Sequence, residues 1–454
     1  MPYSAPAQAT QTAAVIPTGN LRRWIEPWYV AYAILGALAS GAAVILIPLA
    51  IANGGGSATQ MGAAIAAQNV GALFAPFWGW ISDRSKSYRS IFLGGFLLIA
   101  AGFVSFALLK SLSFWLLGAF LIGFGTGASN TVASLFVVEF TPATEWGERI
   151  SWLQTFNAAG SVLGMAGAGF FHPELGMLLS ALLVVPALLV GGWGLPVPGG
   201  PFHVPHVRMT RIDLAKHVRR IEPLTASVTT RLHTFHLADL KRLGALFLTS
   251  FGIFLACWFF FSLALSSFSS LYPVFMLKTF GMTAAKSSLL IAIATALSIP
   301  LYNVAGRLTT GRGPALILAA GMMVRMIALV GLGVLGMFHA SSATLLTSLL
   351  VIPLFGSFQG IWPLLSVASN DLSAALADFG KGTAIGLFNA AAAIASAAGA
   401  IIGGAVAVRF GYPSVGLFAA VGIAVALTFV FHLWRLEKAA TAPAAPDLPV
   451  RKTG

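Results

Sequence analysis

Residues able to carry out chemistry are sparse in this sequence, and few of them lie at a spacing that an active site needs. No HExxH, GxSxG or glycine-rich phosphate motif occurs in its usual setting, and no apolar segment holds a pair of carboxylates. His203 with His206, and His233 with His236, have a spacing that zinc could use, but no cysteine or carboxylate cluster accompanies them. The sequence therefore predicts no enzyme, no metal site and no cofactor.

Side-chain amides in the middle of long apolar segments are the most informative polar groups. An unpaired amide in hydrocarbon costs several kcal/mol, so each of these must face another helix or a watery cavity. Bonding between helices and bonding to a solute both remain open for this set. It comprises Asn69, Asn130, Asn157, Gln359 and Asn389.

Arg325 is the one cation that falls well inside an apolar segment. Counted from Pro314 it lies about 16 Å into the segment, close to the middle of a bilayer. An ionisable residue there is a functional candidate, for example for an anionic solute. A long side chain can instead have a structural role, in which it snorkels or bonds carbonyl groups.

Composition places the elements that must position these groups in a membrane. The 454 residues are 57% hydrophobic and 9% charged, whereas a soluble domain has about 25% charged residues. Long continuous apolar segments exclude barrel strands, so the chain is expected to be an all-α, multi-pass membrane protein. Cys257 is the only cysteine and lies in an apolar segment, which excludes an intrachain disulfide and indicates packing.

Twelve apolar segments are long enough to be transmembrane helices. They are expected at residues 28–50, 60–81, 90–109, 114–138 and 150–171, at a segment ending near 193, and at 243–265, 283–304, 314–337, 343–369, 382–406 and 412–434. Small residues four apart in the fifth, Gly160, Gly164 and Ala168, predict close helix packing. The serines and Tyr272-Pro273 that follow the seventh segment predict that its outer end is broken or extended.

The net charge of +13 does not indicate nucleic-acid binding, because the bases gather in loops on one side of the expected membrane. Arg325 lies within a span, and the cations expected outside are Lys110, Lys278, Lys286 and Arg409. This bias follows the positive-inside rule and places both termini in the cytoplasm. The first 23 residues lack a signal peptide and are expected to form a disordered tail, and residues 436–454 are expected to form a carboxy-terminal tail.

The loop between the second and third spans reads GWISDRSKSYR. Its pattern, Gly79, Asp83, Arg84 and Arg89, resembles the loop motif of the major facilitator superfamily. The resemblance implies a fold of two six-helix bundles related by a pseudo-twofold axis, with Asp83 holding a cytoplasmic gate closed in one state. The alternative is that the cations mark only the cytoplasmic side of the loop.

A direct repeat supports two matching halves. A shift of 232 residues places Phe156-Asn157-Ala158-Ala159 on Phe388-Asn389-Ala390-Ala391, and Glu139 on Asp371. The expected divisions are an amino-terminal bundle at 24–193, a basic cytoplasmic loop at 194–242 and a carboxy-terminal bundle at 243–435. Within the loop, Leu214, Val218 and Ile221 share one helical face among bases, as in a helix on anionic lipid.

The resemblance also implies which spans surround the solute. Spans one, four, seven and ten would line the cavity, with two, five, eight and eleven beside them. Span nine would lie at the periphery, which favours a structural role for Arg325. The expected cavity residues on the first four are Tyr32, Asn130, Tyr272, Gln359 and Trp362, and those on the flanking spans are Asn69, Asn157 and Asn389.

We therefore predict a monomeric secondary transporter that moves a small organic solute across a bacterial inner membrane by alternating access. Export of amphiphilic compounds and uptake of a sugar or organic anion both fit the spans. A membrane sensor or scaffold that retains the fold without transport is the alternative. Proton coupling is in doubt, because the acids available lie near the cytoplasmic edge.

Overall fold

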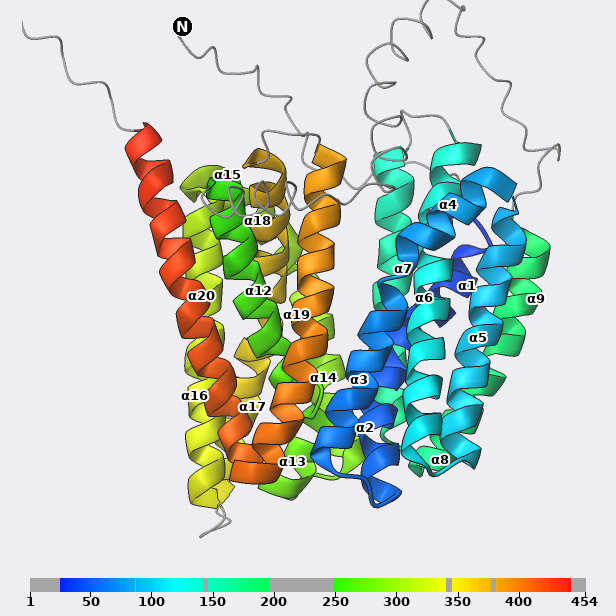
Figure 1. Cartoon of the computed structure of the whole chain (residues 1–454), viewed down its shortest axis with the longest axis horizontal. Coiled ribbons are helices and arrows are strands. Elements are labelled where there is room, and N and C mark those ends of the chain that lie inside the picture. The colour runs from blue at the N-terminus through cyan, green and yellow to red at the C-terminus, as the bar shows by residue number, and fades with distance from the viewer. Residues whose placement is uncertain are drawn as a thin grey trace, which may run out of the picture.

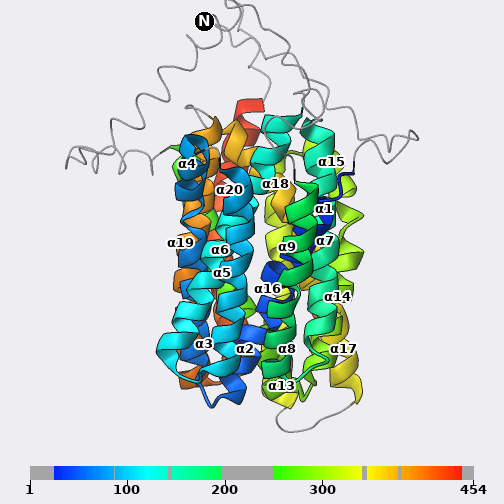
Figure 2. The same ribbon diagram turned by 90° about the vertical axis from the view of Figure 1, so that its right-hand side faces the viewer.

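The computed structural model describes residues 25–85, 87–141, 146–195, 249–339, 345–376 and 381–441. Within these ranges the chain is helical apart from short turns, and it contains no strand. Figures 1 and 2 show long rods standing side by side, nearly parallel to one axis. The rods form two groups, one from residues 25–195 and one from residues 249–441.

The amino-terminal group contains six rods. They are α1, η2 and α2 (Tyr29–Leu35, Gly36–Ala42, Ala43–Asn53), α3 and α4 (Ala58–Ala72, Ala75–Ser85), α5 (Tyr88–Leu108), α6 (Leu112–Phe140), α7 (Trp146–Ala168), and α8 and α9 (Pro173–Leu182, Val184–Gly194). The segment η2 is a π-helix, a wider winding that occurs often at functional sites.

The carboxy-terminal group contains the other six. They are α12 and α13 (Ser250–Ser269, Tyr272–Phe280), α14 and α15 (Ala284–Ser298, Leu301–Arg312), α16 (Pro314–His339), α17 and α18 (Leu345–Gly360, Trp362–Ala375), α19 (Lys381–Phe410) and α20 (Tyr412–Thr441). The break between α12 and α13 confirms the interrupted end that Tyr272-Pro273 predicts. The tenth to twelfth rods run further than expected at their carboxyl ends.

Prolines explain where the rods are interrupted. A proline has no N–H to donate and its ring clashes with the carbonyl group four residues earlier, so a helix breaks just before it. Each of the five interrupted rods has such a residue at the break or within three residues after it. They are Pro76, Pro186, Pro273, Pro300 and Pro363.

Nine helices in the described ranges are long and apolar enough to cross a membrane. The expected second, fifth and eighth spans are not among them. These three rods, formed by α3–α4, α7 and α14–α15, contain many small and polar residues. They also supply the surfaces where the two groups of rods meet, because α3 packs on α19 and α7 packs on α14. Their lower hydropathy therefore follows from facing protein as well as lipid.

The two groups repeat one packing scheme. In the first, α7 packs on α1 and η2, α6 packs on α3 and α5, and α5 packs on α8. In the second, α19 packs on α12, α17 and α18 pack on α14, α15 and α16, and α16 packs on α20. Equivalent rods thus make equivalent contacts, as expected for two matched bundles.

Two of the reversals between helices each depend on a single glycine, which no other residue type could easily replace. A single residue, Gly313, separates α15 from α16, and a single residue, Gly411, separates α19 from α20. Their φ angles are 85° and 84°, in the left-handed region that L side chains rarely adopt. We call the end of the molecule with residues 83–89 and 313 the motif end, and the end with residues 54–57, 281–283 and 411 the distal end.

Candidate functional site

The two halves meet near the distal end, where glycines allow helix backbones to touch. A Cβ atom at Gly62 on α3 would lie 2.0 Å from the carbonyl oxygen of Ala400 on α19. One at Gly404 on α19 would lie 2.4 Å from the carbonyl oxygen of Ala58. A carbon this close would overlap the oxygen, so no larger residue fits unless a helix moves. The seam between α3 and α19 is therefore closed by direct backbone contact.

A second seam joins α7 to α14. A Cβ atom at Gly169, just after α7, would lie 2.1 Å from Oγ of Ser288 on α14. Further toward the motif end along the same seam, Oγ1 of Thr295 lies 3.8 Å from the sulfur of Met165. In Figure 1 the ribbons of the two halves approach one another near α3, α13 and α14 and diverge toward α4, α15 and α18.

Two of the predicted amides lie on the helix faces that form the first seam. Asn69 follows Gly62 by seven residues and Asn389 precedes Ala400 by eleven, so each shares a face with its seam residue. Both are displaced toward the motif end, by about 10 Å and about 16 Å respectively. Neither side-chain amide makes a hydrogen bond to the described residues. These two amides thus have free donors and acceptors beyond the closed seam.

Asn130 and Gln359 differ in how far their amides are used. Asn130 on α6 is exposed, and its side chain makes no hydrogen bond in the described part of the chain. Gln359 on α17 donates Nε2–H to Oγ1 of Thr295 at 3.2 Å. Thr295 also contacts Met165 across the second seam, so Gln359 lies beside that seam.

Tyr32 and Asn157 join helices within the amino-terminal half. The amide of Asn157 on α7 donates to the carbonyl oxygen of Tyr32 on α1 at 3.3 Å, and Tyr32 is 3% exposed. The backbone carbonyl of Asn157 also lies against Gly36. On the same helix, Cβ atoms at Gly160 and Gly164 would lie 1.8 Å and 2.1 Å from carbonyl oxygens of the first rod, which confirms the close packing expected there.

Tyr272 is enclosed by the carboxy-terminal half. Its hydroxyl donates to the carbonyl oxygen of Ser287 at 2.8 Å, and its ring stacks on Phe355 with centroids 4.3 Å apart. The residue is 1% exposed. The structure thus gives Tyr272 a packing role and does not bring it together with Asn69, Asn130 or Asn389.

Arg325 on α16 points into the carboxy-terminal half. Its Nε donates to the carbonyl oxygen of Phe358 at 2.9 Å, so the expected bond to a carbonyl group is present. The side chain is 2% exposed, which excludes snorkelling to an interface. Its guanidinium carbon lies 5.2 Å from the ring centroid of Trp362, another predicted cavity residue, which is only partly buried.

The motif residues lie where α4 ends and α5 begins. Gly79 is in α4, and a Cβ atom there would only touch Thr131 on α6 at 3.6 Å. Arg84 is exposed, with its guanidinium 5.8 Å from the ring of Trp80, and Arg89 is in the first turn of α5. The Asp83 side chain lies outside the described part, as do the histidine pairs and the amphipathic segment of residues 194–242, so the gate role remains a prediction.

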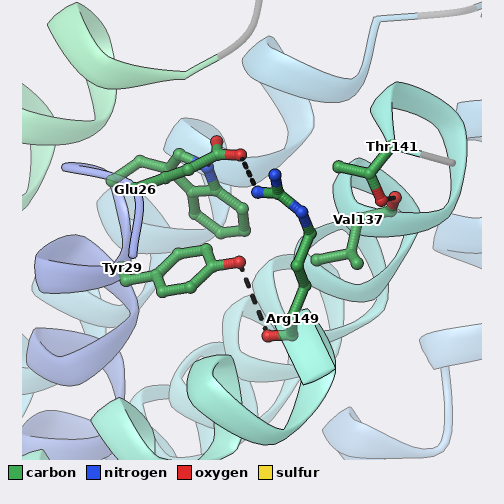
Figure 3. Close-up of polar contacts among 6 residues, drawn as sticks. Glu26, Tyr29, Val137, Thr141 and Arg149 are labelled. Atoms are coloured by element: carbon green, nitrogen blue, oxygen red, sulfur yellow. Dashed lines mark hydrogen bonds and ion pairs between the residues drawn. The ribbon is translucent and has the colours of Figure 1, made fainter. Parts of the chain in front are cut away.

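A polar cluster at the motif end escaped the sequence analysis (Figure 3). Nη1 of Arg149 lies 2.6 Å from Oε1 of Glu26, and Nε1–H of Trp28 donates to Oε2 of Glu26 at 2.7 Å. The Tyr29 hydroxyl donates to the carbonyl oxygen of Arg149. The cluster ties the start of the first rod to the start of α7. No sequence signal could reveal it, because Glu26 and Arg149 are 123 residues apart.

Asp371 is a second residue that the sequence analysis left out of its candidate site. The expected tenth span stops at 369, but α18 continues to Ala375 and the apolar stretch Leu349–Ser373 includes Asp371. The carboxylate lies beside the hydroxyl of Thr309 on α15. The repeat that aligns Glu139 with Asp371 was a usable signal for it.

Comparison with solved structures gives close matches in fold. A nucleoside transporter, NupG, matches with a TM-score of 0.63 and 12% identity over 91% of this chain and 97% of its own. A bacterial homologue of the human lysosomal transporter Spinster, in an inward-facing and unoccupied conformation, matches with a TM-score of 0.65 and 12% identity over 92% and 98%. A POT family transporter bound to 5-aminolevulinic acid matches with a TM-score of 0.63 and 17% identity over 92% and 96%.

Comparison of sequences gives a nearer but shorter match. A glycine betaine, proline, ectoine and pipecolic acid transporter, OusA of Dickeya dadantii (strain 3937), is 29% identical over 197 residues. The match covers 41% of this chain and 35% of that protein, about a third of its length. The sequence profile of the Major Facilitator Superfamily matches residues 29–379, most of the two helical halves. The chain therefore belongs to the Major Facilitator Superfamily and is a multi-pass membrane transporter.

Proposed function

We propose that this transporter moves a small polar organic solute by alternating access, and that the structure represents the state closed at the distal end. The closed seam at Gly62 and Ala400 is the observation that carries the proposal. Beyond it, toward the motif end, the facing helices present amides with unused hydrogen-bonding capacity at Asn69 and Asn389. A solute that enters from the motif end would reach these amides and stop at the seam.

The distribution of cations supports placing the motif end in the cytoplasm of a bacterial inner membrane. Six arginines with described side chains lie toward the motif end, namely Arg84, Arg89, Arg149, Arg307, Arg312 and Arg435. The opposite end carries fewer bases, at Lys110, Lys278, Lys286 and Arg409. Because basic loops resist translocation, the end with more of them stays inside. In this orientation the closed end faces the outside of the cell.

Polar chemistry is favoured over export of amphiphilic compounds by the state of the amides. Three of the five predicted amides, at Asn69, Asn130 and Asn389, make no hydrogen bond with their side chains in the described residues. Amides left unbonded in lipid would cost several kcal/mol each, whereas amides that hydrate and then bind a solute do not carry that cost. An apolar solute would leave them unpaired.

The test is transport by the purified protein in liposomes, with a panel of labelled sugars, amino acids, betaines, nucleosides, organic anions and amphiphilic dyes. Each is measured with and without a proton gradient, and protein-free liposomes give the background. Saturable movement of at least one polar class supports the proposal. Movement of the dyes alone would contradict the polar part, and no saturable movement of any class would contradict transport of small solutes.

A further inference from the structure

Arg325 is a cation without a charged partner inside the carboxy-terminal half. It is eleven residues from the start of α16, about 16 Å along the helix, and is 2% exposed. It forms no ion pair in the described part of the chain. Its Nη1 is buried and has no hydrogen-bond partner there.

Aromatic rings and one carbonyl group surround the guanidinium. Its carbon lies 4.6 Å from the ring centroid of Phe358, 5.2 Å from that of Trp362 and 5.9 Å from that of Phe261. The faces of such rings attract a cation but do not neutralise it. Phe261 and Phe358 are fully buried, while Trp362 is partly exposed and is therefore the accessible wall of the cage.

Among the described side chains, the helices packed on α16 supply no acid near the guanidinium. In their described side chains, the acid on α17 and α18 is Asp371, nine residues beyond Trp362 and about 13 Å further along the helix. A buried charge is strongly unfavourable unless it is paired. The bond from Nε to Phe358 needs one N–H, which a neutral amide could provide, so it does not account for a full positive charge.

The missing negative charge can be supplied by the solute. We propose that Arg325 binds a carboxylate of the transported solute through Nη1, and that the Trp362 ring moves aside to admit it. This inference rests on the proposed function and specifies its substrate class as monocarboxylates, including zwitterions. One cation matches one carboxylate, whereas a phosphate dianion would need a second cation near Arg325, and the other described cations in the spans of this half, Arg409 and Arg435, lie at the ends of their spans.

The position of Trp362 makes such a movement feasible. The ring belongs to the first residue of α18, directly after Ile361, which separates α17 from α18. Pro363 follows, so the helix has lost a backbone hydrogen bond at this joint and can bend there. A small bend would shift the ring relative to Arg325 without unfolding either segment.

The first experiment measures binding and does not require transport. The purified protein is melted in detergent with matched pairs of probes, each a carboxylate and its amide, such as benzoate with benzamide and proline with prolinamide. The wild type is expected to bind at least one carboxylate at least tenfold more tightly than its amide. The Arg325→Gln variant is expected to lose that preference for carboxylate over amide, and Arg325→Lys to retain part of it. The Trp362→Phe variant is expected to change the affinity for the carboxylate but to keep the preference.

Arg409→Gln is the matched control, since it removes an exposed arginine at the distal end of α19. It should leave the preference unchanged. If Arg325→Gln fails to fold, Arg325→Lys and Trp362→Phe carry the test. Equal responses to acid and amide in the wild type would overturn the inference.

The second experiment separates this inference from the proposed function. The same probe pairs are offered to proteoliposomes. Uptake of amides or sugars without uptake of carboxylates would overturn the role of Arg325 and leave transport of polar solutes standing. Binding of carboxylates without movement of any solute would contradict transport and support the site at Arg325.

Discussion

The guanidinium of Arg149 lies 2.6 Å from the carboxylate of Glu26, and this pair holds the start of α7 against the start of the first rod. The two side chains are only 13% and 31% exposed. Removing one partner from a pair at this depth costs more than at the surface and less than in a fully buried pair. It therefore contributes to the rigidity of the amino-terminal half at its motif end.

We expect Glu26→Gln to lower the stability of the protein by about 1–2 kcal/mol, measured as thermal melting in detergent. Glutamine keeps an oxygen for the Trp28 indole, so the change isolates the charge. Lys110→Gln is the control, because Lys110 pairs with Glu174 at the same 2.6 Å distance but both are well exposed. Equal losses in the two variants would show that burial does not strengthen the Glu26 pair.

The glycine seam gives a second prediction. Gly62→Ala would place a Cβ atom 2.0 Å from the Ala400 carbonyl oxygen. Overpacking of this kind costs about 1–3 kcal/mol, which reduces the population of the state closed at the distal end by about 5–150-fold. Distances between spin labels at the distal end, in a Cys257→Ser background, should lengthen. Gly167→Ala is the control, since a Cβ atom there meets nothing within 4 Å.

The amides divide into two groups that a mutation series can separate. Asn157→Ala should lower stability by about 0.6 kcal/mol, because it removes the bond to Tyr32 between two helices. Asn389→Ala and Asn69→Ala should leave melting unchanged and raise the KM for a transported solute by up to about tenfold. If the last two variants melt earlier and transport normally, these amides serve packing instead of solute binding.

Tyr272 offers a direct test of packing against solute contact. Tyr272→Phe removes the hydroxyl that donates to Ser287 but keeps the stack on Phe355, so stability should fall by about 1 kcal/mol with transport retained. Tyr302→Phe, at a tyrosine that is 42% exposed, should change stability less. A raised KM in Tyr272→Phe at unchanged stability would return this residue to the solute pathway.

Patterns local in sequence predicted the architecture well. Apolar length gave the helical class, the small residues of α7 gave its close packing against another helix, and Tyr272-Pro273 gave a broken helix. Each of these depends on residues that are neighbours along one helix. Which side of Tyr272 faces its own bundle depends instead on the rotation of one rod against others, and sequence spacing leaves that undetermined.

Contacts between distant segments could not be predicted. Glu26 meets Arg149, and Arg325 meets Phe261 and Trp362, only because several rods pack in one particular order. The resemblance to the superfamily placed the ninth span at the periphery and so favoured a structural Arg325. Helix α16 lies at the edge of its half in Figure 1, yet its arginine points inward, where a buried charge needs a partner.

The prolines that interrupt five of the rods have a mechanical consequence. A helix bends at an interruption at lower cost than along a continuous stretch, so the two segments of such a rod can swing separately. In each of α3–α4, α14–α15 and α17–α18, one segment lies toward the motif end and the other toward the distal end. The two ends can therefore close independently. An occluded form, closed at both ends around its solute, is an expected intermediate between the outward-facing and inward-facing forms.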